Sequence, residues 1–366
     1  MIAKIGVLHI IDSLNIGGAE RVAVNIANLV HSEGKYQSHL CVTRQMGFLQ
    51  NMLIPGIPMI FLNKKLSLDP NAFVKLIKYI RKNNIAIIHA HSSSLFMAAL
   101  VKMVIPKIRI VWHIHFGALS QRKKSIYLYR FILNNVSKVF VVNQELLKWA
   151  TEVLGFSEQN VYYLANFVCH DFQESYKPLK LPGDDGKRIV CVANLRPEKD
   201  HMSLIRAMRL VVDEIPSAHL LLVGAGRQDE YQELIFHEAN QLGLMGHITW
   251  LGEREDVFQI LQFCSIGVLS SVSEGLPLAL LEYGTAGLPV VATNVGEVPY
   301  VLENGDLGLL VNPKDECHLA SSLIQLLKEP DLRKSLGESF KTHVREKFNP
   351  VEINNRIHQV YENIIK

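Results

Sequence analysis

The sequence predicts an α/β protein made of two domains, each built around a parallel sheet. Three observations support this prediction: the length of 366 residues, the alternation of apolar runs of strand length with helical patterns, and a break in that alternation near the middle. A chain of this length is too long to fold around one compact hydrophobic core, so two domains are expected. Alternating strands and helices are typical of βαβ units. With 48% hydrophobic and 20% charged residues, the composition is that of an ordinary globular protein.

The first half contains seven predicted strands with helical patterns between them. The apolar runs of strand length cover residues 4–11, 38–43, 58–63, 85–91, 109–115, 138–143 and 161–166. Two segments between them, 19–34 and 69–83, repeat apolar residues at helical spacing. The first run follows Lys4 but is ended by Asp12, and no small-residue cleavage site follows it. We therefore interpret it as a buried strand and not as a signal peptide.

A linker is expected at residues 176–187, which read YKPLKLPGDDGK and have no apolar periodicity. Strand-length runs resume at residues 188–195, 219–226, 247–252, 266–272, 288–295 and 307–313, and residues 315–366 are helical in pattern. We expect a domain at 1–178, a second at 186–345, and a helix at 346–366 that packs back on the first. In open α/β folds ligands bind at the carboxyl ends of the strands, so we expect a ligand in a cleft between the two domains.

Cysteine content, hydropathy and charge restrict the class of protein. The five cysteines form no CxxC and no cluster with histidine at the spacing of metal ligands, so neither a disulfide framework nor a zinc site is predicted, and a cytoplasmic setting is expected. No apolar stretch approaches the roughly 18 to 20 residues of a membrane-spanning helix. Residues 1–180 carry 21 Lys and Arg against 9 Asp and Glu, whereas 181–366 carry 17 against 26, which indicates different partners for the two halves.

Two glycine motifs follow predicted strands. In NIGGAE, Gly17 and Gly18 would let backbone N–H groups approach an anion at a helix N-terminus; the alternative is a tight turn between strand and helix. In VGAGRQDE, Gly224 begins a G-x-G that has Asp229 where a third glycine belongs, so a dinucleotide fingerprint is not complete. The alternative for Gly224 is again a turn, although it could line a ligand site.

The motif NLRPEKD places Arg196 and Lys199 just after a predicted strand and before a helical pattern. Cations in such a loop suit a diphosphate, with Arg196 as a fork and Lys199 as a point charge. The alternative is a solvated basic loop in which Glu198 pairs with its neighbours.

Four histidines lie at the ends of two predicted strands: His89, His91, His113 and His115. Strand alternation puts each pair on one face of the sheet. A single strand histidine is more often a core residue than a catalyst. We expect no metal here, because no carboxylate accompanies the four imidazoles.

The segment SEGLPLALLE holds two acids, Glu274 and Glu282, around an apolar run. Buried unpaired carboxylates are costly, so both acids need partners. Pro277 is expected as the first helical residue, which would leave free N–H groups between Gly275 and Leu278, except at the proline. Glu282 lies eight positions after Glu274, about 80° round an ideal helix, so both could face one ligand.

With these motifs the chain closely resembles glycosyltransferase family 4, the retaining nucleotide-sugar enzymes with the GT-B fold. The resemblance runs nearly end to end, and its quoted segments are GGAE, LANFV at 164–168, NLRPEKD, LVGAG, GEREDV and the long segment from Ser273 to Pro313. The glutamates separated by seven residues are the most specific part. The resemblance implies two Rossmann-like domains, an acceptor-binding one first and a nucleotide-sugar-binding one second.

The resemblance also implies roles for individual residues. Glu282 would accept bonds from the ribose hydroxyls, and Glu274 would hold the transferred sugar. Backbone N–H groups at Gly18, Leu276 and Leu278 would contact the diphosphate or the sugar, and His115 matches a histidine at the acceptor edge of the sugar. The expected catalytic residues are Glu274, His115, Lys199 and Arg196; the expected donor-binding residues are Gly17, Gly18, Asn194, Gly224, Gly275, Leu276, Leu278 and Glu282.

Two departures from the family pattern matter. Ala193, Asn194 and Leu195 stand where the family often has Gly-Arg-Leu, so an arginine is absent, and Arg196 lies two residues later. Glu297 stands where a glycine is common, which weakens the expectation of anion binding by that loop.

The resemblance implies transfer of a sugar from a nucleoside diphosphate sugar, UDP-linked rather than GDP-linked, to a hydroxyl of a lipid-linked or polysaccharide acceptor. Because no D-x-D motif is present, we expect no metal requirement. We also expect no other cofactor and no nucleic-acid partner. Residues 120–135 combine cations with apolar residues, as in a helix that touches an anionic membrane, so we expect a peripheral protein at the inner face of the cytoplasmic membrane. The alternatives are a sugar-nucleotide epimerase and an inactive nucleotide-sugar-binding scaffold.

Overall fold

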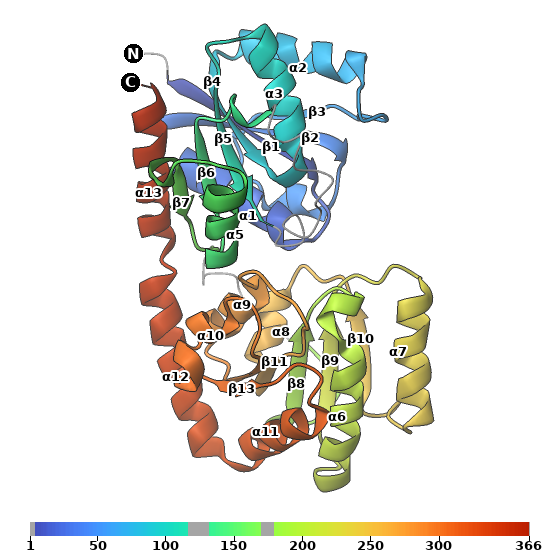
Figure 1. Ribbon diagram of the computed structural model, residues 1–366. Coiled ribbons are helices and arrows are strands. Elements are labelled where there is room, and N and C mark those ends of the chain that lie inside the picture. The colour runs from blue at the N-terminus through green and yellow to red at the C-terminus, as the bar shows by residue number, and fades with distance from the viewer. Residues whose placement is uncertain (1–3, 116–131, 170–178, 366) are drawn as a thin grey trace. The chain divides into compact units, whose positions relative to one another are not determined.

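The computed structural model describes residues 4–115, 132–169 and 179–365 (Figure 1). Chain contacts divide the protein into two compact units: residues 1–169 with 350–366, and residues 170–349. The C-terminal helix thus belongs to the first unit. None of the helices in the described ranges is both long and apolar enough to cross a membrane.

The first unit is a parallel seven-stranded sheet with helices on both faces, in the order β3-β2-β1-β4-β5-β6-β7. Its strands are β1 (Ile5–Ser13), β2 (Tyr36–Gln45), β3 (Met59–Phe61), β4 (Ile85–His91), β5 (Arg109–Ile114), β6 (Lys138–Val141) and β7 (Val161–Tyr163). Its helices include α1 (Gly18–Ser32), α2 (Pro70–Lys82), α3 (Leu95–Val104), α5 (Gln144–Lys148) and α13 (Pro350–Ile365).

Strand alternation gives the two faces of this sheet different partners. One face, with Leu8, Ile88 and Trp112, is fully buried against α2, α3 and α5. Each such leucine or isoleucine contributes about 1.5–3 kcal/mol by leaving water. The opposite face packs beside α1 and α13, which contact each other and which lie on the same side of the sheet in Figure 1.

The second unit is a parallel six-stranded sheet in the order β10-β9-β8-β11-β12-β13. The strands are β8 (Arg188–Val192), β9 (His219–Val223), β10 (Ile248–Gly252), β11 (Ile266–Leu269), β12 (Val290–Thr293) and β13 (Leu309–Val311). The helices are α6 (His201–Glu214), α7 (Glu230–Gln241), α8 (Val257–Gln262), α9 (Leu278–Ala286), α10 (Val298–Val301), α11 (Glu316–Lys328) and α12 (Pro330–Lys347).

Helices cover both faces of the second sheet as well. Helices α6, α7 and α11 share one core with the strands, while α9 contacts α8 and α12 on the other side. Several helices begin where the sequence supplies an acidic cap; for example, Asp229 accepts a hydrogen bond from the backbone N–H of Gln232 at 3.2 Å. Both sheets are thus doubly wound parallel sheets, and each predicted strand in the two halves is confirmed.

Candidate active site

The centre of the second sheet is the point where the strand order reverses. β8 and β11 are neighbours there, with Ile189 opposite Ile266, while the chain continues outward from them in opposite directions. Loops that leave two such strands diverge to opposite faces, which leaves room for a ligand at their carboxyl ends. The sequence puts NLRPEKD after β8 and SSVSEG after β11.

Two hydrogen bonds join these loops. The Ser270 hydroxyl donates to the backbone carbonyl of Lys199 at 2.9 Å, and the backbone N–H of Val272 donates to the carbonyl of Glu198 at 3.0 Å. Lys199 ends a short 3-10 turn, Pro197–Lys199, that the proline begins. The position of Lys199 is therefore fixed against β11 as well as against its own strand.

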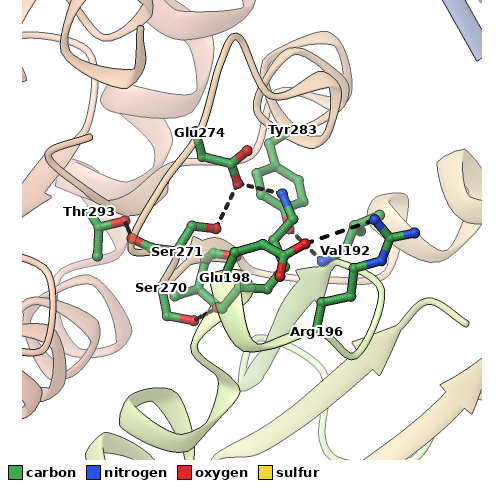
Figure 2. Close-up of polar contacts among 10 residues, drawn as sticks. Val192, Arg196, Glu198, Ser270, Ser271, Glu274, Tyr283 and Thr293 are labelled. Atoms are coloured by element: carbon green, nitrogen blue, oxygen red, sulfur yellow. Dashed lines mark hydrogen bonds and ion pairs between the residues drawn. The ribbon is translucent and has the colours of Figure 1, made fainter. Parts of the chain in front are cut away.

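The side chains of Lys199 and Glu274 meet at this junction. The Lys199 ammonium donates to Oε1 of Glu274 at 2.6 Å, and the Ser271 hydroxyl donates to the same oxygen at 2.6 Å (Figure 2). Both bonds from described residues end on Oε1, so Oε2 can accept a hydrogen bond from a ligand hydroxyl. The Glu274 side chain is 7% exposed and that of Lys199 25%, so a ligand could reach the ammonium more easily than the carboxylate.

The last residue of β12 and the loop that follows it are hydrogen-bonded to the loop that carries Glu274. The Thr293 hydroxyl donates to the carbonyl of Ser271 at 2.6 Å, and the backbone N–H of Glu297 donates to the carbonyl of Gly275 at 2.9 Å. Gly296 has φ +54°, and a Cβ at this position would lie 2.2 Å from the carbonyl oxygen of Glu274. Only glycine allows so close an approach of the two backbones.

Helix α9 carries Glu282, which is buried at 5% exposure. The helix begins at Leu278; Pro277 has ψ 124° and is its N-cap, so the prediction of Pro277 as the first helical residue was wrong by one position. Glu274 lies in the loop before the helix, so the helical angle that we used to relate it to Glu282 does not apply. Pro277 keeps extended backbone torsions, which is usual for the residue that precedes a first turn.

Tyr283 anchors α9 to the central strands. Its hydroxyl accepts from the backbone N–H of Val192 at 2.7 Å, at the end of β8. A Cβ on Gly267 of β11 would lie 2.6 Å from the Tyr283 ring, so the glycine makes room for the tyrosine. The helix that bears Glu282 is therefore fixed to the same two strands as Lys199 and Glu274.

Asn194, in the loop after β8, lies beside Gly224, in the loop after the neighbouring strand β9. The Asn194 side-chain oxygen accepts from the backbone N–H of Ala225 at 2.9 Å, which ties the loop after β8 to the loop after β9. Gly224 has φ +155°, and a Cβ there would lie 2.2 Å from the carbonyl oxygen of Ala193. These contacts give both residues a role in holding the two loops together.

Arg196 is directed differently from Lys199. Its guanidinium is 3.8 Å from a carboxylate oxygen of Glu198, and its side chain is 36% exposed (Figure 2). The contact with Glu198 is the one considered in the alternative interpretation of this loop, and a role of Arg196 at a diphosphate stays a prediction. The structure brings Lys199 and Glu274 together and pairs Arg196 with Glu198.

Three of the predicted residues, Gly17, Gly18 and His115, belong to the first unit. Gly17 is the N-cap of α1 and Gly18 its first residue, where a Cβ would meet nothing within 4 Å. His115 follows β5, and its Nε2 lies 3.0 Å from Nδ1 of His91. Burial lowers the pKa of His115 to about 3, so the imidazole is neutral at pH 7.

Sequence reasoning missed Ser271, Thr293 and Tyr283. The one available signal for Ser271 was the serine three residues before Glu274, a spacing at which a hydroxyl can reach a carboxylate in a turn. Tyr283 and Thr293 had no signal, because their partners are backbone groups far along the chain.

Comparison with known proteins gives consecutive matches to two sequence families. The family described as Glycosyltransferase Family 4 matches residues 16–172, and the family described as Glycosyl transferases group 1 matches residues 172–343. The first match covers the first unit from α1 to β7, without β1 and α13, and the second covers most of the unit that contains Lys199 and Glu274.

Two curated relatives span most of the chain. N-acetyl-alpha-D-glucosaminyl L-malate synthase of Bacillus anthracis is 26% identical over 80% of this chain and 78% of its own. UDP-Gal:alpha-D-GlcNAc-diphosphoundecaprenol alpha-1,3-galactosyltransferase of Escherichia coli is 22% identical over 99% of this chain and 98% of its own.

The fold agrees with a solved structure. Anabaena HepE, determined in complex with UDP and glucose, matches with a TM-score of 0.79 at 18% identity, over 98% of this chain and 100% of its own. At that identity the likeness shows the fold, which is GT-B. Taken with the two consecutive family matches, it shows that this chain is a glycosyltransferase of family 4 with the GT-B fold.

Proposed function

We propose that this enzyme transfers a sugar from a UDP-sugar to a hydroxyl of a lipid-linked or polysaccharide acceptor, with retention of the anomeric configuration, in the synthesis of a cell-surface polysaccharide. The observation that carries the proposal is the Lys199–Glu274 pair at the carboxyl ends of β8 and β11. A cation and a hydrogen-bond acceptor side by side suit a sugar attached to a diphosphate. The choice of UDP is supported by the UDP-linked donor named for the E. coli relative and by UDP in the HepE complex.

Each residue in the donor site has a proposed task. Lys199 neutralises charge that grows on the leaving diphosphate, and Oε2 of Glu274 accepts from hydroxyls of the transferred sugar. Glu282 binds the ribose, and backbone N–H groups at Gly275, Leu276 and Leu278 contact the diphosphate or sugar, near the N-terminus of α9 where anions are favoured. For the three residues of the first unit, the proposed tasks are those that the family resemblance implies. Gly17 and Gly18 bind the donor, and His115 lies at the acceptor edge of the transferred sugar.

Charge stabilisation by Lys199 removes the need for a metal at the diphosphate. The lysine is already oriented by Glu274 and by the bond between its carbonyl and Ser270, so little reorganisation precedes the reaction. Arg196 can add a second cation only by leaving Glu198, which costs little for an exposed pair. The bond between the anomeric carbon and the diphosphate oxygen breaks through an oxocarbenium-like transition state. The acceptor oxygen bonds to the anomeric carbon on the face that the diphosphate leaves, and the acceptor's proton passes to the leaving phosphate oxygen.

Donor turnover measured with and without acceptors tests this proposal against its alternatives. We expect slow hydrolysis of a UDP-sugar alone and a large increase with a lipid-linked acceptor, with the new glycosidic bond in the donor's configuration. Interconversion of the free nucleotide sugar without any acceptor would indicate an epimerase. Binding of UDP with no turnover under any condition would indicate an inactive scaffold.

The absence of a metal requirement is tested separately. We expect EDTA to leave the transfer rate unchanged. A complete loss that Mg²⁺ restores would contradict the role given to Lys199.

We also propose that the first unit binds an anionic membrane. Residues 120–131 of the segment that we expected to do so lie outside the described residues. In the described part, the segment 59–110 carries nine Lys and Arg against a single acid, Asp69. The E. coli relative is named for an acceptor attached to diphosphoundecaprenol, a membrane lipid.

The exposed side of α2 and the loop before it have the composition expected of such a surface. Leu66 and Leu68 in the loop are 66% and 62% exposed, and Val74 on α2 is 50% exposed. The same side of α2 exposes Lys78, Arg81 and Lys82, while Leu76, Ile77 and Ile80 pack inward. We call these exposed residues the α2 face; apolar tips flanked by cations favour an anionic bilayer.

Vesicle flotation tests the α2 face. At low salt we expect the protein to float with phosphatidylglycerol vesicles and not with phosphatidylcholine vesicles, and the double variant Leu66→Ser with Leu68→Ser to bind several-fold less. Leu234→Ser is the matched control, because Leu234 is a 49% exposed leucine in the second unit. Failure of the unmodified protein to bind anionic vesicles at low salt would refute the proposal.

A further inference from the structure

Five histidines gather on one face of the sheet in the first unit. His9 on β1 lies opposite His89 on β4, and His91 on β4 lies opposite His113 on β5. In-register neighbours in parallel strands point to the same face, and His115 follows two residues after His113. We call these five residues the histidine cluster.

The rings of the histidine cluster are in mutual contact. The His89 and His91 rings have centroids 4.6 Å apart with 14° between their planes, and His9 lies 5.2 Å from His89. One ring nitrogen from each of His9, His89 and His91 lies within 4.8 Å of the other two. A closed triangle of nitrogens is an arrangement that packing of apolar side chains does not require.

Several of these nitrogens are buried without a hydrogen bond. Both ring nitrogens of His9, and Nε2 of His89 and of His91, have no partner among the described residues. All three side chains are fully buried. A buried polar atom without a hydrogen-bond partner lowers the stability of the folded protein by about 1–3 kcal/mol. The histidine cluster is therefore unfavourable for folding unless a ligand binds to these nitrogens.

Full burial favours the neutral form of an imidazole over the charged form, and His9, His89 and His91 are all fully buried. A neutral imidazole has one nitrogen lone pair, which is the form that binds a metal.

The Nδ1 atoms of His89 and His91 have hydrogen-bond partners. Nδ1 of His89 lies 2.7 Å from the hydroxyl of Tyr361 on α13, and Nδ1 of His91 lies 3.0 Å from Nε2 of His115. In metal sites the ring nitrogen away from the ion usually donates to a carboxylate, a carbonyl or water; a hydroxyl oxygen and an imidazole nitrogen can accept in the same way, which fixes the tautomer and leaves Nε2 to the ion. Both Nε2 atoms are those without a partner among the described residues.

We propose that His9, His89 and His91 bind one divalent transition-metal ion, of which Zn²⁺ is the best match. Three imidazoles and a water satisfy the tetrahedral coordination of Zn²⁺ at about 2.0–2.1 Å, and a site made of three histidines needs no carboxylate ligand. At that bond length, binding would draw the three nitrogens together from their present spacing to about 3.4 Å. The ion would link β1, β4 and, through Tyr361, the C-terminal helix, and thereby stabilise the first unit.

This proposal revises our expectation from the sequence. We expected no metal because no carboxylate accompanies the four histidines at the strand ends, but strand register adds His9 from β1. A second triad, His91, His113 and His115, shares His91 with the first, and its His91–His115 contact occupies one nitrogen of each, so one ion is expected and not two. The proposal rests on the histidine cluster and not on the proposed transfer reaction, although His91 contacts His115, to which the proposed function gives a task.

Metal titration of the untagged full-length protein tests the proposal. After removal of metals with EDTA and dialysis, we expect Co²⁺ to bind one ion per chain with the intense visible absorption of a tetrahedral site, and Zn²⁺ to displace it and raise the melting temperature. His9→Gln should abolish the absorption. His237→Gln, at an exposed histidine in the second unit, should retain it.

A pair of tyrosine variants separates metal binding from folding. Tyr361→Phe removes the hydroxyl beside His89, and we expect it to weaken Zn²⁺ affinity by about 10–100-fold. Tyr79→Phe makes the same change at the other His–Tyr contact, in which the Tyr79 hydroxyl lies 2.9 Å from Nδ1 of His39, and should leave the affinity unchanged. If His9→Gln does not fold, this pair alone decides.

The proposal is overturned if the unmodified protein binds neither Co²⁺ nor Zn²⁺ with one-to-one stoichiometry. It is also overturned if a folded His9→Gln variant binds as tightly as the unmodified protein, or if Tyr361→Phe and Tyr79→Phe have equal effects on affinity.

Discussion

At the scale of single residues, the carboxylate of Glu274 is oriented by two donors that reach the same oxygen. Lys199 supplies the charge, and Ser271 supplies a hydroxyl at 2.6 Å. A hydrogen bond to a charged group contributes about 1.5–3 kcal/mol. Loss of the hydroxyl therefore leaves the ion pair in place but makes the direction of the carboxylate less definite.

We expect Ser271→Ala to lower kcat for sugar transfer by about 10-fold or more, with little change in melting temperature. Steady-state kinetics with a UDP-sugar checks this. Ser321→Ala is the control, because the Ser321 hydroxyl donates only to a backbone carbonyl in an exposed part of α11. An unchanged kcat in Ser271→Ala would show that the lysine alone positions Glu274.

His201 makes the stability of the second unit depend on pH. Burial lowers its pKa to about 4, and the charge of Lys199 adds to this effect. A histidine with a lowered pKa in the folded state stabilises above the unfolded pKa of about 6.5, and this contribution is lost as the pH falls from 6.5 towards 4. Protonation of His201 in the folded state is unfavourable, because the buried ring would then carry a charge near that of Lys199.

We expect the free energy of unfolding of the second unit to fall by about 2–3 kcal/mol more between pH 7 and pH 4.5 in the unmodified protein than in His201→Gln. Urea unfolding of both proteins at the two pH values measures this difference. The other buried histidines are present in both proteins, so their contributions to the pH dependence cancel. Equal pH dependence in the two proteins would mean that His201 is charged or exposed in the folded state.

At the scale of elements, the loops after β8, β11 and β12 form the donor site together, and glycines let their backbones touch. Gly296 combines φ +54° with a position where a Cβ would lie 2.2 Å from the Glu274 carbonyl. We expect Gly296→Ala to displace the Glu274 loop, lower donor turnover at least 10-fold, and cost about 2 kcal/mol of stability.

The matched control for this loop is Gly246→Ala, because a Cβ at Gly246 would meet nothing within 4 Å. Turnover assays and thermal unfolding of the two variants are compared directly. Normal turnover in Gly296→Ala would mean that the loops can separate without affecting the site.

The elements themselves could be predicted because their signals are local. A buried parallel strand such as Ile85–His91 reads as a short apolar run, and α2 reads as an amphipathic pattern behind an aspartate cap. The contact between Lys199 and Glu274 was not predicted; the family resemblance only assigned both residues to the catalytic site. This contact forms because β8 and β11 are neighbours in the sheet, and neither segment by itself indicates the order of the strands.

The histidine cluster, too, could be predicted only in part, because it depends on which strands are neighbours. His89, His91, His113 and His115 could be grouped from strand alternation, but His9 joins them only through the register of β1 with β4. Ser271 was missed because a side-chain donor to a loop carboxylate depends on turn geometry. Contacts that join distant segments were thus the part that the sequence alone did not provide.

At the scale of the whole molecule, the two units have opposite charge. The first half carries an excess of 12 cations and the second an excess of 9 acids, and the Glu274 site lies in the acidic half. This division fits the proposal that the first unit meets an anionic surface while the second holds the donor. Lys199 then provides local positive charge in an acidic unit.

The most direct test of the proposed donor site compares Glu274→Gln with Glu282→Gln in two assays, calorimetric binding of UDP and turnover of a UDP-sugar. We expect Glu274→Gln to bind UDP nearly as tightly as the unmodified protein but to lose at least 100-fold in turnover. Glu282→Gln should instead weaken UDP binding by about 10-fold or more, because a ribose hydroxyl loses a charged acceptor. Normal turnover in Glu274→Gln, or equal loss of UDP binding in both variants, would contradict the account.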